Sequence, residues 1–218
     1  MTAARWVCLD VGETLIDETR MWSTWADELG VSRLTLMAAL GGAIATGGDH
    51  QEVFALLGVR DWAVAEPAVQ RAYGMFAPGD LYPDALPTLD ALRAAGFRVA
   101  IMGNQPASRE AELRALGVKA EVMAMSDQMG VGKPDPAFFA AALRLMGDPP
   151  PGSVAYVGDR VDNDVVPAAE AGMRAVWLRR GPWGILQADT DGRAALVLDR
   201  LADLPGALVR SRAERRGG

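Results

Sequence analysis

The sequence predicts an α/β protein with a doubly wound parallel sheet. Short apolar runs bounded by Gly, Asp or Pro alternate with longer segments of helical periodicity. The runs expected to be strands cover residues 5–10, 97–102, 121–125, 154–158, 174–178 and 196–198. The helices expected between them cover residues 84–95, 106–116, 136–146 and 164–171. Strands and helices that alternate at this spacing form a parallel sheet with helices on both faces.

Each of the four expected helices is followed by a glycine, where a left-handed residue commonly ends a helix. These are Gly96, Gly117, Gly147 and Gly172.

The alternation is interrupted once, after the first expected strand. Residues 17–80 look helical throughout, with apolar positions recurring at helical spacing around Trp22, Trp25 and Leu29. We therefore expect a Rossmann-like core made of residues 1–16 and 81–218, with an inserted all-helical cap at residues 17–80. The two tryptophans are expected to pack the cap, with stacking on a substrate as the alternative.

The charge and cysteine content restrict the class of partner and the compartment. A formal net charge of −6 and a pI near 4.9 argue against nucleic acid or an anionic membrane as partner. Cys8 is the one cysteine, which fits a reducing, cytoplasmic location. No apolar run is long enough to span a membrane, and no signal segment is seen. The arginines after residue 209 are expected to form a frayed, solvated tail.

Carboxylates, glycines and one lysine follow the expected strands. Ligands bind beyond the carboxyl ends of the strands in such a sheet, near the point where the winding direction reverses. Lys133 is one of only two lysines in the chain. Carboxylates at two strand ends and a lysine near a third form a plausible site for a hard divalent cation and a phosphate. The residues in question are Asp10, Gly12, Glu13, Thr14, Gly103, Asn104, Lys133, Asp159 and Asp164.

In this order, the segments Asp10–Leu15, Gly103-Asn104, Gly132–Asp135 and Gly158–Asp164 resemble the four motifs of the haloacid dehalogenase superfamily. The resemblance covers the whole expected core, and the insert after the first motif resembles the helical cap of many members. It implies a Mg²⁺-dependent phosphatase that acts on a small phosphorylated metabolite.

The resemblance also implies a role for each matching residue. Asp10 matches the nucleophile that becomes an aspartyl-phosphate, and Lys133 matches the lysine that neutralises it. The implied Mg²⁺ ligands are Asp10, the Gly12 carbonyl, Asp159 and Asp164. The residues expected around the phosphate are Thr14, Glu13, Gly103 and Asn104.

Two positions depart from the family pattern. Gly12 stands where the phosphatases of the family have a second Asp, the general acid and base. Gly103 stands where the second motif has Ser or Thr, so Asn104 or a backbone N–H would have to donate instead. We expect slow turnover from the loss of the acid. Glu13 is the nearby carboxylate that could replace it, but alternating side-chain directions favour no substitute.

Two other chemistries of the superfamily and one non-catalytic function are alternatives to a phosphatase. Metal-independent dehalogenases of the superfamily have an aromatic residue two positions after the nucleophile, where this chain has Gly12. The phosphonate-cleaving members use a cap lysine, and residues 17–80 contain no lysine. The alternative from another class is a degenerate protein that binds a phosphorylated ligand or a protein partner.

Overall fold

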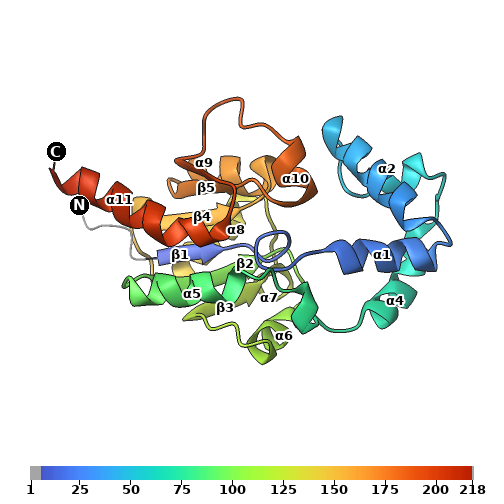
Figure 1. Cartoon of the computed structure of the whole chain (residues 1–218), viewed down its shortest axis with the longest axis horizontal. Helices are drawn as coiled ribbons and strands as arrows, with labels where there is room; N and C mark the ends of the chain where they lie inside the picture. The colour runs from blue at the N-terminus through green and yellow to red at the C-terminus, as the bar shows by residue number, and fades with distance from the viewer. Residues whose placement is uncertain (1–5, 218) are drawn as a thin grey trace.

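The computed structural model describes residues 6–217, with side chains described up to Ser211. Residues 1–5 and 218 of the expected core lie outside the described residues. The described part contains a six-stranded sheet in the order β3-β2-β1-β4-β5-β6, and every neighbouring pair is parallel (Figure 1). The strands are β1 Trp6–Leu9, β2 Arg98–Gly103, β3 Val122–Met125, β4 Val154–Gly158, β5 Arg174–Leu178 and β6 Leu196–Leu198. The predicted fold class and strand positions are confirmed.

Helices follow most strands of the core. They are α5 Ala85–Ala94, α6 Arg109–Ala115, α7 Ser126–Met129, α8 Pro136–Leu145, α9 Val166–Glu170, α10 Gly181–Leu186 and α11 Leu204–Gly217. The glycines that follow the expected helices all have a left-handed φ, between 77° and 89°. A residue with a side chain is strained at such an angle, which explains why glycine ends each of these helices.

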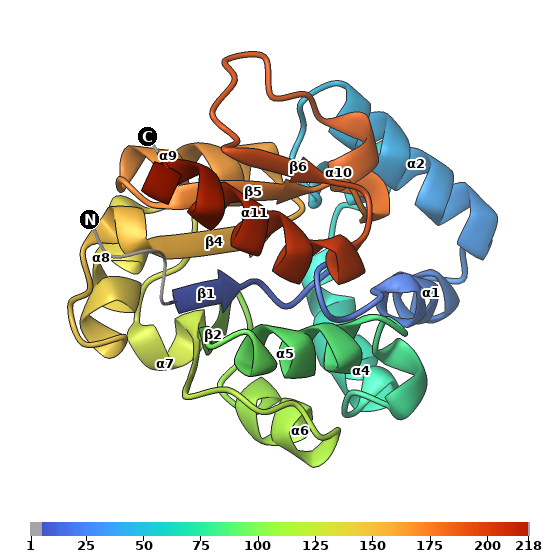
Figure 2. The same ribbon diagram turned by 60° about the vertical axis from the view of Figure 1, so that its left-hand side comes forward.

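The sheet separates two apolar layers, because side chains alternate along the central strand. Val7 and Leu9 of β1 pack in a cluster with residues of α5, α6 and α11. Trp6 and Cys8 point into a second cluster with residues of α8 and α9. Figure 2 shows α5 and α11 side by side over the first of these faces. The sheet is thus covered on both faces, as expected for a doubly wound fold.

The C-terminal segment differs from the expected frayed tail, since α11 continues to Gly217. Its first turns bury Leu204, Ala207 and Leu208. Residues three and four apart lie on one face of a helix, so this apolar face holds α11 against the core. The side chains of Arg212, Arg215 and Arg216 lie outside the described detail.

Between β1 and α5 the described chain has helices and isolated β-bridges but no strand. The helices are α1 Thr19–Glu28, α2 Arg33–Ala45, α3 Glu52–Leu56 and α4 Trp62–Tyr73, apart from a short 3₁₀ turn at Pro78–Asp80. Figure 1 shows α1, α2 and α4 together at the end of the molecule beyond the sheet. The chain enters and leaves this region at one place, because Ile16 and Leu81 form an antiparallel bridge and the Asp17 amide donates to the Asp80 carbonyl (2.7 Å). The cap boundaries at residues 17 and 80 stay a prediction.

Within the described residues, no helix is by itself both long and apolar enough to cross a membrane; α1 and α2 reach that length and composition only together, across a 115° bend.

Candidate active site

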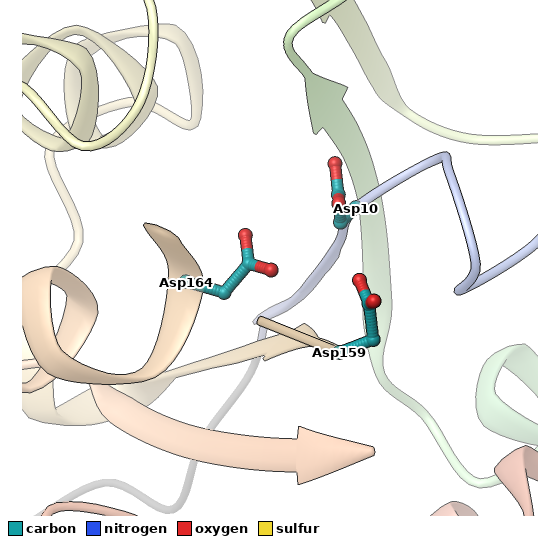
Figure 3. Close-up of side chains that lie close together, drawn as sticks. All are labelled: Asp10, Asp159 and Asp164. Atoms are coloured by element: carbon teal, nitrogen blue, oxygen red, sulfur yellow. The ribbon is translucent and has the colours of Figure 1, made fainter. Parts of the chain in front are cut away.

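Three aspartates meet at the carboxyl ends of β1 and β4. Asp10 directly follows β1 and Asp159 directly follows β4, while Asp164 lies in a π-helical turn, Val161–Val165, before α9. One carboxylate oxygen from each lies within 4.8 Å of the other two (Figure 3). β1 and β4 are neighbours, and the chain winds outward from them in opposite directions. The cluster therefore lies at the topological switch point.

Lys133 lies between two of these aspartates. Its Nζ is 2.7 Å from Asp10 Oδ1 and 2.5 Å from Asp164 Oδ1, and the ammonium group is almost completely buried. Burial opposes its charge, but the two carboxylates outweigh burial and raise the pKa of Lys133. The lysine therefore stays charged inside the site.

Asn104 fixes the backbone on which Lys133 is carried. Its side-chain oxygen accepts from the Lys133 amide (2.7 Å), and its Nδ2 donates to the Lys133 carbonyl (2.8 Å). The expectation that Asn104 contacts the phosphate stays a prediction. The contacts seen instead make it a positioning residue for the lysine.

The charge of the cluster is not balanced by the protein alone. Asp159 Oδ2 is buried and has no hydrogen-bond partner among the described residues. Burial, followed by Asp164 and Asp10, raises the pKa of Asp159 well above its ordinary value. Three buried carboxylates beside one lysine fit a hard divalent cation, which would supply the missing charge.

We expect Mg²⁺ to raise the melting temperature of the wild-type protein and Asp159→Asn to abolish that rise. At 100 times Kd a ligand stabilises the native state by about 2.7 kcal/mol, which corresponds to several degrees for a chain of this size. In EDTA the variant should melt above the wild type, because one uncompensated buried charge is gone. Thermal denaturation with EDTA or Mg²⁺ measures both effects.

The control for this experiment is Asp162→Asn. The Asp162 carboxylate is half-exposed and bound to Arg160, outside the cluster. It should leave the Mg²⁺ response unchanged. An equal response in Asp159→Asn would rule out Asp159 as a ligand.

Gly103 and Gly158 leave room for the carboxylates of Asp10 and Asp164, because a side chain at either glycine would collide with them. A Cβ on Gly103 would lie 2.5 Å from Asp10 Oδ1, and one on Gly158 would lie 2.2 Å from the Cγ of Asp164. Such distances are too short for any non-bonded contact. The Asp10 carboxylate thus lies against the position where the family has Ser or Thr, which gives a structural reason for Gly103.

Glu13 does not lie free in the site. Its backbone adopts a left-handed φ of 50°, at the position where the family motif has Gly. Its carboxylate accepts from the Tyr82 hydroxyl and from the Glu18 amide (3.0 Å), and it packs against Gly181. Burial raises the pKa of Glu13, while these two hydrogen bonds oppose the rise. Its expected role beside the phosphate stays a prediction.

Thr14, the next residue of the motif, is fully buried. Its Oγ1 has no hydrogen-bond partner among the described residues, and its carbonyl accepts from Arg180 (3.2 Å). Contact between Thr14 and a phosphate also stays a prediction.

Sequence reasoning missed Glu18, which lies beside Gly12. A Cβ on Gly12 would come within 2.4 Å of Glu18 Oε1. Burial, followed by the negative charges of Glu13 and Asp10, raises the pKa of Glu18 to about 8. The Trp22 indole N–H lies close enough to lower that pKa slightly, although it makes no hydrogen bond of normal geometry within the described part of the chain. No motif contains this residue, and no signal in the sequence places it beside Gly12.

The cap tryptophans have different surroundings. Trp25 packs against Phe54 and Trp62, with ring centroids 4.8 and 6.0 Å away, inside the helical region as expected. Trp22 reaches Trp183 of α10 in the core, with ring centroids 6.4 Å apart. Trp22 therefore connects the helical region to the core.

The chain is similar to a known family and to curated phosphatases. The family model of haloacid dehalogenase-like hydrolases matches residues 4–172. Glyceraldehyde 3-phosphate phosphatase of Methanopyrus kandleri is 36% identical over 154 residues, which make up 66% of this chain and 66% of that protein. Phosphoserine phosphatase of Thermus thermophilus is 38% identical over 104 residues, 46% of this chain and 41% of that protein. The chain thus matches two thirds or less of the length of these relatives.

Among solved structures, the putative HAD-hydrolase YfnB of Bacillus subtilis, bound to magnesium, has a TM-score of 0.75. It is 17% identical in sequence, and the match covers 95% of this chain and 99% of that one. At this identity the likeness shows the fold alone. Because the family model spans more than half of the chain, the protein belongs to the haloacid dehalogenase-like hydrolases.

Proposed function

We propose that this protein hydrolyses a small phosphate monoester in a Mg²⁺-dependent reaction that passes through an aspartyl-phosphate on Asp10. The observation that carries the proposal is the buried ammonium of Lys133, 2.7 Å from Asp10 Oδ1. A carboxylate can approach an anionic phosphate only if nearby positive charge reduces the repulsion. The phosphatase names of the two curated relatives support the same reaction class.

Asp10 and Lys133 have different roles in the proposed reaction. An Asp10 oxygen attacks phosphorus, and the bond from phosphorus to the ester oxygen breaks. Lys133 offsets the charge on Asp10 and on the phosphoryl oxygens. Water then attacks the phosphorus and breaks its bond to Asp10, which releases phosphate.

The cation site belongs to the same proposal. Asp10, the Gly12 carbonyl, Asp159 and Asp164 would hold Mg²⁺, which when bound supplies positive charge to the phosphoryl group. Asp159 Oδ2, which has no hydrogen-bond partner in the part of the chain that the structure describes, supports this assignment.

The residues also argue against the two other chemistries of the superfamily. Position 12 is glycine, not the aromatic residue of metal-independent dehalogenases, and a carboxylate cluster is present. The helical region contains no lysine for a Schiff base. The degenerate alternative is supported by Gly12 and Gly103, and it predicts ligand binding without turnover.

Turnover of p-nitrophenyl phosphate tests the proposal. Wild-type protein should release nitrophenolate with Mg²⁺, and EDTA or Asp10→Asn should abolish the release. Mass spectrometry of a rapidly quenched reaction should find a phosphate on the peptide that contains Asp10. If orthophosphate or the ester raises the melting temperature but no variant-sensitive turnover is seen, the protein is a binder and the proposal is wrong.

A further inference from the structure

We propose that Glu18 is the proton donor and acceptor of the reaction and replaces the Asp that is missing at position 12. The inference rests on the proposed phosphatase function and assigns a residue outside the four motifs to the site. It also changes the expectation of slow turnover, which assumed that no acid stands near Gly12.

The geometry that carries the inference is the contact between Glu18 and Gly12. A Cβ built on Gly12 would lie 2.4 Å from Glu18 Oε1 and 3.0 Å from its Cδ. The Glu18 carboxylate therefore occupies the space into which a side chain at position 12 would project. The Glu18 carboxylate thus lies where a side chain two residues after Asp10 would be, and the family has its acid at that position.

Glu18 is held in this position by the backbone on both sides. Its amide donates to Glu13 Oε1 (3.0 Å), and its carbonyl accepts from the Trp22 amide (3.0 Å) in the first turn of α1. The Glu13 carboxylate also accepts from the Tyr82 hydroxyl. Glu13 is thus a positioning residue, and its carboxylate oxygens are already used. Glu13 is therefore not the acid, although it is closer to Gly12 in the sequence than Glu18 is.

The other carboxylate of this loop is also engaged. Asp17 Oδ1 accepts from the Thr19 amide (2.8 Å), which is a local contact at the start of α1. Asp10 and Asp159 belong to the nucleophile and cation cluster. Among the described carboxylates of the loop, Glu18 is the one placed against Gly12.

The proton balance closes with Glu18 and water. In the first step Asp10 forms a bond to phosphorus, the ester bond breaks, and protonated Glu18 gives its proton to the leaving oxygen. In the second step the Glu18 carboxylate takes a proton from the attacking water, the bond from phosphorus to Asp10 breaks, and phosphate leaves. Glu18 ends protonated and Asp10 ends ionised, as at the start.

The test compares esters with good and poor leaving groups. Glu18→Gln should lower kcat/KM for an alkyl phosphate by about 10²–10⁴-fold, the usual contribution of a positioned acid. Its effect on p-nitrophenyl phosphate should be much smaller, because nitrophenolate leaves without a proton. A plot of log kcat/KM against leaving-group pKa should become steeper, which a purely structural role would not produce.

A double variant moves the carboxylate from position 18 to position 12. Glu18→Ala should lose alkyl phosphate turnover, and Gly12→Asp with Glu18→Ala should regain it, because the new side chain enters the space that Glu18 left. Gly12→Asp alone should bring no gain, since the two carboxylates collide. The matched control is Glu28→Gln, an exposed glutamate at the far end of the helix that begins directly after Glu18, which should leave all rates unchanged.

Two results would overturn the role of Glu18 while the proposed function stands. One is a wild-type protein that hydrolyses only aryl phosphates. The other is a Glu18→Gln variant that loses alkyl and aryl turnover equally, or neither. Failure of the proposed function is distinct, because then even aryl phosphate turnover would not depend on Asp10.

Discussion

Lys133→Ala should destabilise the protein and inactivate it together. The variant leaves Asp10 and Asp164 buried without the ammonium that lies 2.7 and 2.5 Å from them. Removal of one partner from a buried ion pair typically costs about 3–5 kcal/mol. Turnover should fall by about 10²–10³-fold, as it does when one electrostatic donor to a transition state is removed.

The loss of stability in Lys133→Ala should grow with pH. Burial already raises the pKa of Asp164 while Lys133 opposes that rise, so removal of the lysine raises it further. A carboxyl group with a raised folded-state pKa favours the native state when protonated. That contribution is complete below the unfolded pKa and is lost as pH rises through the folded pKa. The variant should therefore lie closer to the wild type at pH 5 than at pH 8.

Urea unfolding in EDTA at the two pH values measures this difference. Lys119→Ala is the control, since Lys119 is exposed and is the one other lysine of the chain. It should match the wild type in stability and turnover. If Lys133→Ala were as stable as the wild type, or if its loss of stability did not change with pH, the importance of the buried ion pair would be contradicted.

Gly158→Ala should remove Mg²⁺ binding and turnover, although it adds only one methyl group. The new Cβ would come within 2.2 Å of Asp164 Cγ and 2.6 Å of its Cβ. Asp164 cannot simply rotate away, because it is fully buried and is held by Lys133 Nζ and the Arg160 amide (3.1 Å). Overpacking of this kind costs about 1–3 kcal/mol.

The measurements are the Mg²⁺-induced shift in melting temperature and aryl phosphate turnover. Gly42→Ala in α2 is the control, since nothing lies within 4 Å of a Cβ there. It should be neutral or slightly stabilising, because alanine favours a helix more than glycine does. An unchanged Mg²⁺ response in Gly158→Ala would show that Asp164 is not needed for the cation.

Part of the site could be predicted from the sequence because it follows from the topology of the sheet. A residue that directly follows a strand of a parallel sheet must lie at its carboxyl edge, so Asp10 and Asp159 were expected to meet. The motif order added Lys133 and Asp164, and the structure brings all four together. Local signals also sufficed for the strands and for the glycines that end the helices.

Other elements depended on contacts between distant segments. The short helices α7 and α10 have no periodic pattern long enough to predict them, and α11 is stabilised by an apolar face that only the core covers. The role of Asn104 was likewise hidden, because its partner Lys133 lies 29 positions away in the sequence.

The sequence alone determined the fold class, the nucleophile candidate and the carboxylates of the candidate cation site, since alternating apolar runs and strand-end residues are local properties of the chain. It also identified Gly12 as a missing acid. Only the tertiary structure decided what occupies the space beside Gly12. That space is shaped by the turn after β1, which engages the Glu13 carboxylate with Tyr82 and brings Glu18 against the glycine. A residue's neighbours across such a turn depend on backbone angles and packing that no spacing rule specifies.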